Sequence, residues 1–147
     1  MIAGLARRHG TEAFEPHVTL LGGLAGAEET LSAARRLAAG LRPFEVQLLG
    51  ASTGLEFLHC VFVTVAGTPE LVGARTLARE AFGVQPAEPF RPHLSLVYGD
   101  LGAEEKEFAR LAAGELRSSF VADALHLVDT SGPASRWRRL ERFPFSD

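Results

Sequence analysis

The sequence predicts an α+β fold of two similar, pseudo-symmetric lobes, each an antiparallel sheet with outer helices, and three observations support this prediction. First, residues 12–29 match residues 88–105 at a constant offset of 76, with 10 of 18 positions identical. Second, helix-like and strand-like segments follow both matched segments in the same order. Third, 147 residues with 46% apolar and 22% charged side chains fit one ordinary globular domain. We therefore treat residues 1–147 as a single domain.

The first half is expected to run helix, histidine-bearing strand, helix, strand, strand. Residues 1–10 can supply the end of a helix, and the segment around His17 alternates apolar and polar side chains as a strand does. A helix is predicted over residues 27–39, because apolar residues recur near helical spacing and Gly40 follows. Two strands are predicted over residues 44–51 and 57–66.

The second half is expected to repeat this order. A helix over residues 69–82 begins at Pro69, which suits a first helical turn, and leads to a strand around His93. A helix over residues 103–113 precedes two further strands. These are predicted over residues 120–129 and 137–143, separated by a turn at residues 131–133.

The repeat also predicts an element that the sequence does not contain. The strand at residues 61–65 precedes the helix at residues 69–82, and an offset of 76 puts its counterpart ahead of residue 1. We therefore expect the first sheet to lack its N-terminal strand. A second copy of the chain could fill such a gap, so self-association through an incomplete first sheet is a further expectation.

Charge and composition restrict the classes of partner. A net charge of -3 disfavours a protein that wraps long nucleic acid. Apolar runs such as residues 61–66 are far shorter than the roughly 20 residues of a membrane span, so no membrane partner is expected. Cys60 is the single cysteine, which fits a reducing compartment and predicts a cytoplasmic location.

The two matched segments carry the residues best suited to catalysis. In each expected strand a histidine and a hydroxyl residue stand two positions apart and so share a face, about 7 Å apart. These pairs are His17 with Thr19 and His93 with Ser95. Two imidazoles facing a central cleft can give and take protons near neutral pH, while the hydroxyls hold phosphate oxygens. This predicts phosphoryl chemistry that needs neither a metal nor a cofactor.

The patterns PHVTLLGG and PHLSLVYGD resemble the two His-x-Thr/Ser signatures of the 2H phosphoesterase superfamily. The second pattern is most similar to the cyclic phosphodiesterase branch, and the resemblance extends to LVDTSGP near the C-terminus. It implies hydrolysis of a cyclic phosphate on a ribose, either ADP-ribose 1'',2''-cyclic phosphate or a nucleoside 2',3'-cyclic phosphate opened to the 2'-phosphate. It also implies that His17 and His93 are catalytic and that Thr19, Ser95 and Tyr98 bind the phosphate, with His93 favoured as base and His17 as acid.

Two alternative functions stay open at this point. One is an RNA-end 2',3'-cyclic phosphodiesterase or 2'-5' RNA ligase-like enzyme, but the apolar segment at residues 20–23 stands where such relatives commonly carry a basic residue. The other is a non-catalytic module that binds a small nucleotide.

The remaining candidate residues are expected to have structural roles. The histidines outside the repeat should pack in the fold, and Cys60 should be a buried apolar residue rather than a nucleophile. The phenylalanines beside the signatures should pack in the core, and the C-terminal arginines should be solvated or ion-paired. These residues are His9, His59, His126, Phe57, Phe90, Arg136, Arg138, Arg139 and Arg142.

Overall fold

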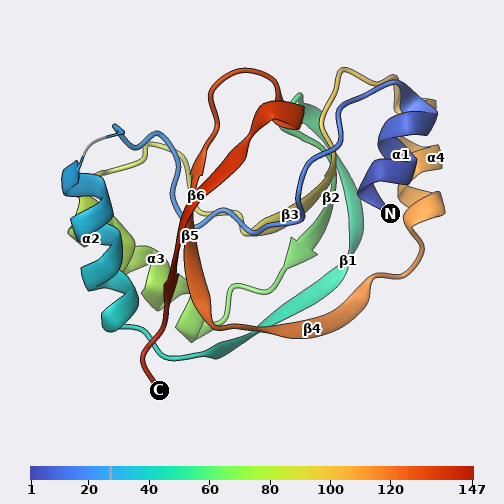
Figure 1. Cartoon of the computed structure of the whole chain (residues 1–147). Helices are drawn as coiled ribbons and strands as arrows, with labels where there is room; N and C mark the ends of the chain where they lie inside the picture. Colours follow the sequence, from blue (N-terminus) through green and yellow to red (C-terminus); the bar gives the residue numbers. More distant parts are fainter. Residues whose placement is uncertain (27) are drawn as a thin grey trace.

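A computed structural model describes residues 1–26 and 28–147, which form helices, six strands and a short 3₁₀ helix (Figure 1). The α-helices are α1 Ile2–His9, α2 Glu28–Ala39, α3 Pro69–Phe82 and α4 Ala103–Ala113. The strands are β1 Phe44–Glu56, β2 His59–Val65, β3 His93–Val97, β4 Arg117–Ala122, β5 Ala124–Asp129 and β6 Arg138–Pro144. The 3₁₀ helix η1 spans Ala134–Arg136. The predicted bounds of α3 and α4 agree with the structure, and the first residue of the predicted helix 27–39 lies outside the described residues.

Local sequence signals explain where α3 begins and ends. The Thr68 hydroxyl accepts a hydrogen bond from the Leu71 amide, and Pro69 needs no amide partner in the first turn. Gly83 follows the last turn with φ 63°, the left-handed conformation that glycine adopts without a steric penalty. These signals determine where α3 begins and ends, and the segment that leads to His93 follows the helix.

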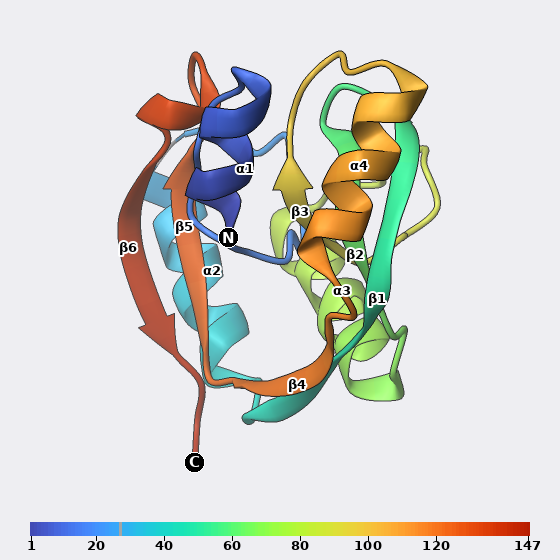
Figure 2. The same cartoon turned by 90° about the vertical axis from the view of Figure 1, so that its right-hand side faces the viewer.

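The strands form two antiparallel sheets. One has the order β3-β2-β1-β4, and the other pairs β5 with β6. Figure 2 shows β4 running along the base of the molecule to β5, so that the chain passes from one sheet to the other there. The α+β fold of antiparallel sheets with outer helices is therefore confirmed.

The single predicted strand over residues 120–129 is wrong. The chain leaves the first sheet at Ala122, passes Asp123 outside any strand, and starts the second sheet at Ala124. The Asp123 carboxylate accepts a hydrogen bond from Arg142 Nη2 at 3.1 Å, which fixes this corner to β6. Alternation of side chains continues through the corner, so the sequence pattern does not mark it.

The segment around His17 also differs from prediction, because it is not a regular strand. It makes one isolated antiparallel bridge, between Val18 and Leu94 of β3. A strand needs a ladder of such pairs, and the part of the chain that the structure describes supplies only this one. The β5–β6 sheet has two strands, whereas the β3-β2-β1-β4 sheet has four. The two lobes are therefore similar but not equal. Self-association through an incomplete first sheet stays a prediction.

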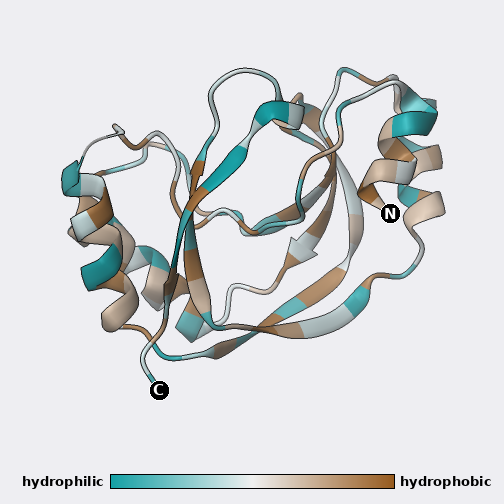
Figure 3. Ribbon diagram, viewed as in Figure 1, coloured by the Kyte–Doolittle hydropathy of each residue, from teal (hydrophilic) through white to brown (hydrophobic). Residues whose placement is uncertain are grey.

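The largest core cluster lies between the first sheet and the helices α1 and α4. It joins Ile2 and Leu5 of α1 to Val61 and Val63 of β2, and Ala109 of α4 completes it. Figure 3 shows hydrophobic residues recurring along the strands of this sheet and on the helices. A second group of clusters joins α2, α3 and the β5–β6 sheet. Both signature segments therefore rest on packed apolar layers.

Cys60 is fully buried in the first cluster, as the sequence predicted. Burial raises the pKa of its thiol, which keeps the thiol protonated and unreactive near neutral pH. Among the described helices, none is long and apolar enough to cross a membrane. The cytoplasmic location stays a prediction.

Replacing Val63 by alanine tests this account of the core. Val63 is 0% exposed, so the truncation removes buried methyl groups and should lower the free energy of unfolding by about 2 kcal/mol. Val121→Ala is the matched control, because Val121 lies in the same sheet and is 64% exposed. Its effect should stay within about 0.5 kcal/mol. Urea unfolding measures both, and equal losses would contradict the assignment of the core.

Candidate active site

The two signature segments meet at residues that are equivalent in the repeat. Val18 and Leu94 differ by the offset of 76 and pair antiparallel with each other. An approximate two-fold axis therefore passes between them. Antiparallel register from this bridge puts His17 opposite Ser95 and Thr19 opposite His93. The structure thus brings together the two histidines and two hydroxyls that the sequence selected.

Both imidazoles are held in the same way. His17 Nδ1 lies 2.7 Å from the Glu15 carbonyl oxygen, and His93 Nδ1 lies 2.8 Å from the Arg91 carbonyl oxygen. A carbonyl oxygen only accepts hydrogen bonds, so Nδ1 carries the hydrogen in each ring and donates it. The other nitrogen, Nε2, is then the atom left to exchange a proton with a bound molecule.

Tyr98 stands against one of these two histidines. Its hydroxyl lies 3.3 Å from His17 Nε2, and its ring stacks on Phe14 with centroids 4.0 Å apart. The strand β3 ends at Val97, so Tyr98 is no longer bound by the alternation of that strand. Burial raises the pKa of the Tyr98 hydroxyl, and an interaction with the Ser95 side chain opposes that rise. The phenol therefore stays protonated near neutral pH and can donate to His17.

The two hydroxyl residues have different surroundings. Thr19 is exposed, whereas Ser95 is buried and its hydroxyl donates to the Leu58 carbonyl oxygen at 3.5 Å. Leu58 belongs to the tight turn between β1 and β2, and the adjacent Phe57 carbonyl accepts from the Gly99 amide at 3.0 Å. This turn, residues 57–58, therefore contacts both Ser95 and Gly99, which follows β3.

The expectation that Phe57 packs in the core is wrong. Its side chain is 60% exposed, because residues 57–58 form the turn and β2 begins only at His59. The run of apolar residues that predicted a strand from residue 57 extends into this turn. An exposed aromatic ring therefore stands on the turn that contacts Ser95.

His59 is a site neighbour that the sequence did not reveal. Its ring centroid lies 4.4 Å from that of His93 in an edge-to-face arrangement, and it stacks on Phe62 at 3.7 Å. Burial lowers the pKa of His59, and the electrostatic effects of the neighbouring His93 and Arg91 lower it further, against the opposing effect of Glu56. The repeat puts Ser135 at the equivalent position, so duplication carried no signal for a histidine here.

Trp137 is a second neighbour outside the predicted set. Its ring centroid is 6.3 Å from that of His17 and 5.5 Å from that of Tyr98. His17 thus lies among Phe14, Tyr98 and Trp137, whereas His93 lies among His59 and Phe62. The two halves of the site share their histidine geometry but differ in the aromatic groups around it.

The C-terminal arginines are solvated or ion-paired, as expected: Arg136 is exposed, and the other three form ion pairs. Arg139 pairs with Glu15 at 3.1 Å, Arg142 with Asp123 at 3.1 Å and Arg138 with Asp129 at 3.7 Å. They give β6 the hydrophilic stretch seen in Figure 3. Among the residues that the structure describes, no group of three or more His, Cys, Asp or Glu side chains is placed to hold a metal ion.

Comparison with known proteins supports the resemblance. Residues 5–134 match the family model of the 2'-5' RNA ligase superfamily. A protein of Arabidopsis thaliana named cyclic phosphodiesterase is 35% identical over 107 residues, covering 72% of this chain and 59% of that protein. The chain therefore spans about three fifths of the length of this relative.

Solved structures show the same fold. A crystal structure titled phosphoesterase has a TM-score of 0.65 at 18% identity, covering 99% of this chain and 92% of that one. E. coli LigT complexed with 3'-AMP gives 0.63 at 18% identity, with 99% and 90% covered. A protein of Thermus thermophilus, TT0787, gives 0.61 at 17% identity, with 98% and 91% covered. Since the family model covers most of the chain and both histidine signatures, this chain belongs to the 2'-5' RNA ligase superfamily, which confirms the predicted 2H phosphoesterase relationship.

Proposed function

We propose that this chain is a cyclic phosphodiesterase that hydrolyses a cyclic phosphate on the ribose of a small nucleotide, or of ADP-ribose, without a metal. The observation that carries the proposal is the matched pair of imidazoles, each with Nδ1 bound to the carbonyl two residues earlier. Two imidazoles so oriented offer two Nε2 atoms for one acid and one base. The similarity to the plant cyclic phosphodiesterase supports the same activity.

The surroundings of the two Nε2 atoms support His93 as the base and His17 as the acid. Tyr98 engages His17 Nε2, and a phenol can donate to the neutral imidazole or accept from the protonated one. Among the described residues, none makes a hydrogen bond to His93 Nε2, so that nitrogen is the one free to accept a proton from water. His17 Nε2 then delivers a proton whose position Tyr98 helps to fix.

The reaction we propose conserves atoms and protons. The water oxygen bonds to phosphorus as the bond from phosphorus to one ribose oxygen breaks. His93 Nε2 takes a proton from the water, and His17 Nε2 gives one to the leaving ribose oxygen. Thr19 donates a hydrogen bond to a non-bridging oxygen, on which negative charge must be held through the transition state. Ser95 donates to the other once its hydroxyl hydrogen turns away from the Leu58 carbonyl, a long contact of 3.5 Å. The product is a ribose with one phosphate monoester, the 2'-phosphate for a 2',3'-cyclic substrate, and one free hydroxyl.

The turn at residues 57–58 favours a substrate with a nucleobase. Phe57 is exposed on this turn, and the neighbouring Leu58 carbonyl contacts the Ser95 hydroxyl. An exposed aromatic ring on the turn that contacts a phosphate-binding hydroxyl could stack on a base while the phosphate occupies the site. We therefore propose Phe57 as a contact for the base of the nucleotide.

Substitution of the two histidines tests the proposed function. His17→Ala and His93→Ala should each lower kcat for adenosine 2',3'-cyclic phosphate by roughly 10²- to 10⁴-fold, because each removes one proton transfer. Turnover is measured with excess EDTA, and phosphorus NMR identifies the phosphate monoester formed. His9→Ala is the matched control, since His9 lies on α1 outside both signatures and its ring packs against Phe108 of α4. Loss of wild-type activity in EDTA would overturn the metal-free reaction, and full activity of either histidine variant would overturn its assignment.

Tyr98→Phe tests the role of the phenol. The substitution keeps the ring that stacks on Phe14 and removes only the hydroxyl beside His17. One lost hydrogen bond should lower kcat/KM by about fivefold to tenfold, with the unfolding midpoint little changed. Ser118→Ala, which removes an exposed hydroxyl on β4, should leave kcat/KM unchanged. Equal kcat/KM for Tyr98→Phe and wild type would remove Tyr98 from the site.

A second candidate function is RNA-end processing, which the match to the family model of the 2'-5' RNA ligase superfamily favours. The net charge of -3 argues for a small substrate instead. We expect kcat/KM on a cyclic mononucleotide to exceed that on an oligonucleotide ending in the same 2',3'-cyclic phosphate. The reverse order would favour RNA ends, and tight binding of the mononucleotide without turnover would favour a non-catalytic binding module.

A further inference from the structure

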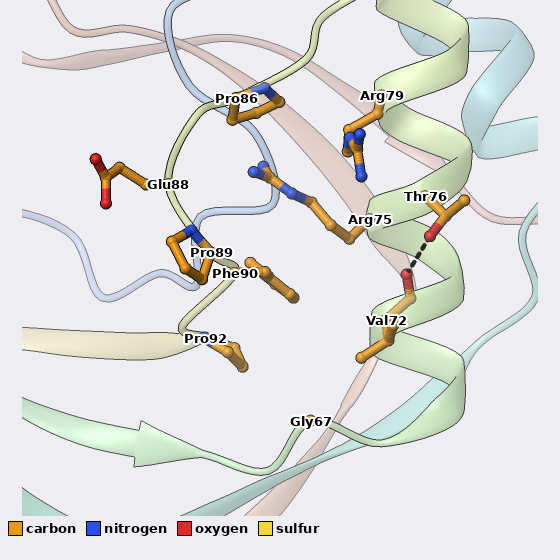
Figure 4. A pocket seen from close by; sticks show the side chains of 10 residues that line it. All are labelled: Gly67, Val72, Arg75, Thr76, Arg79, Pro86, Glu88, Pro89, Phe90 and Pro92. Atoms are coloured by element: carbon orange, nitrogen blue, oxygen red, sulfur yellow. Dashed lines mark hydrogen bonds between the residues drawn. The ribbon is translucent and has the colours of Figure 1, made fainter.

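A cavity of about 320 Å³ lies outside the site described above, between α3 and the segment that leads to His93 (Figure 4). Its lining includes Arg75, Thr76 and Arg79 from α3, together with Phe90 and Pro92 from that segment. None of the five predicted site residues lines it. A volume of this size holds far more than one water molecule, which occupies roughly 30 Å³ in the liquid.

Two arginines define the chemistry of this cavity. Arg75 and Arg79 are one helical turn apart, half-buried, and both extend from α3 into the cavity (Figure 4). Burial lowers the pKa of Arg75, and the nearby charge of Arg79 lowers it further. Among the described residues, neither arginine takes part in an ion pair. Glu88 also lines the cavity but is exposed and points away from both guanidinium groups in Figure 4.

Most N–H groups of these two guanidinium groups make no hydrogen bond to the residues that the structure describes. Arg75 Nη1 donates to the Leu20 carbonyl, and the Arg75 guanidinium lies 5.0 Å from the centroid of the Phe90 ring. Arg79 Nη2 donates to the Gln85 side chain, while Arg79 Nε is buried without a hydrogen-bond partner in the described structure. A buried donor without an acceptor costs free energy, which a bound anion would recover.

We propose that this cavity is a second anion site, which binds the phosphate group of a small soluble molecule through Arg75 and Arg79. Two adjacent guanidinium groups match the several acceptor oxygens of a phosphate better than the two of a carboxylate. Thr76 donates its hydroxyl to the Val72 carbonyl at 3.1 Å and is therefore not counted among the phosphate donors. The site adjoins both signatures, because Leu20 follows Thr19 and Pro92 precedes His93.

Calorimetric titration with inorganic phosphate tests the proposal separately from the catalytic site. The probe is added to the full chain carrying His17→Ala and His93→Ala, and one binding event should persist. Adding Arg79→Gln to that background should weaken phosphate binding about tenfold or more, since a charged donor is lost. Arg79→Lys should restore part of the affinity. Arg36→Gln, which changes an exposed arginine of α2, is the matched control and should have no effect.

A measurement on the unsubstituted chain keeps the test independent of folding of the variants. In amide NMR spectra, phosphate should shift the signals of residues 75–79 and of the non-proline residues Gln85, Ala87, Glu88 and Phe90. Titration with AMP should shift the same signals if the site accepts a phosphate monoester carried on a nucleoside. No binding in the double-histidine variant, an unchanged affinity in Arg79→Gln, or phosphate-induced shifts confined to the two signatures would each overturn the proposal.

Discussion

The antiparallel contact between Val18 and Leu94 is the constraint on which the site depends. These residues are equivalent in the repeat, so pairing them fixes an approximate two-fold axis between the two signatures. The same contact determines which residues face each other across the axis. A shift of one residue would turn each histidine to the opposite face of its segment, because side chains alternate along extended backbone. One bridge thus sets the geometry of four polar side chains, while the packed layers on either side keep it in register.

Charge pairs from the two sheets hold the residues that fix the histidines. The Glu15 carbonyl binds His17, and the Glu15 carboxylate pairs with Arg139 of β6. The equivalent residue Arg91 binds His93 through its carbonyl and pairs with Glu56 of β1 at 3.6 Å. The backbone role is therefore the same, while the side-chain charges are opposite. Both pairs are largely exposed and contribute little stability, so their effect is to link each imidazole to a sheet.

The features that could be predicted from the sequence are those that depend on local signals or on the repeat. Helices α3 and α4 have clear starts and glycine stops, and the His17 and His93 pairs follow from the duplication itself. The break at Asp123 was not predictable from alternation, since a strand can turn a corner without changing its pattern. His59 was not predictable either, because its contact with His93 arises from the β1–β2 turn and has no equivalent in the first half. Contacts such as that of His59 with His93, which join residues outside the duplicated segments to the site, leave no signal in the repeat.

The differences between the two halves of the site support the proposed assignment of one histidine as acid and the other as base. A perfectly duplicated site would give two equal imidazoles, but hydrolysis needs one that accepts a proton and one that donates. Tyr98 stands where the first half has Gly22, so only His17 has a phenol at its Nε2. On the other side His93 has His59 beside it, and the lowered pKa of His59 keeps that ring neutral when the site is near neutral pH. A neutral neighbour does not add a second positive charge beside the proposed base. The repeat accounts for the pair of imidazoles, and Tyr98 and His59, which it does not duplicate, are the differences that support the separate roles proposed for them.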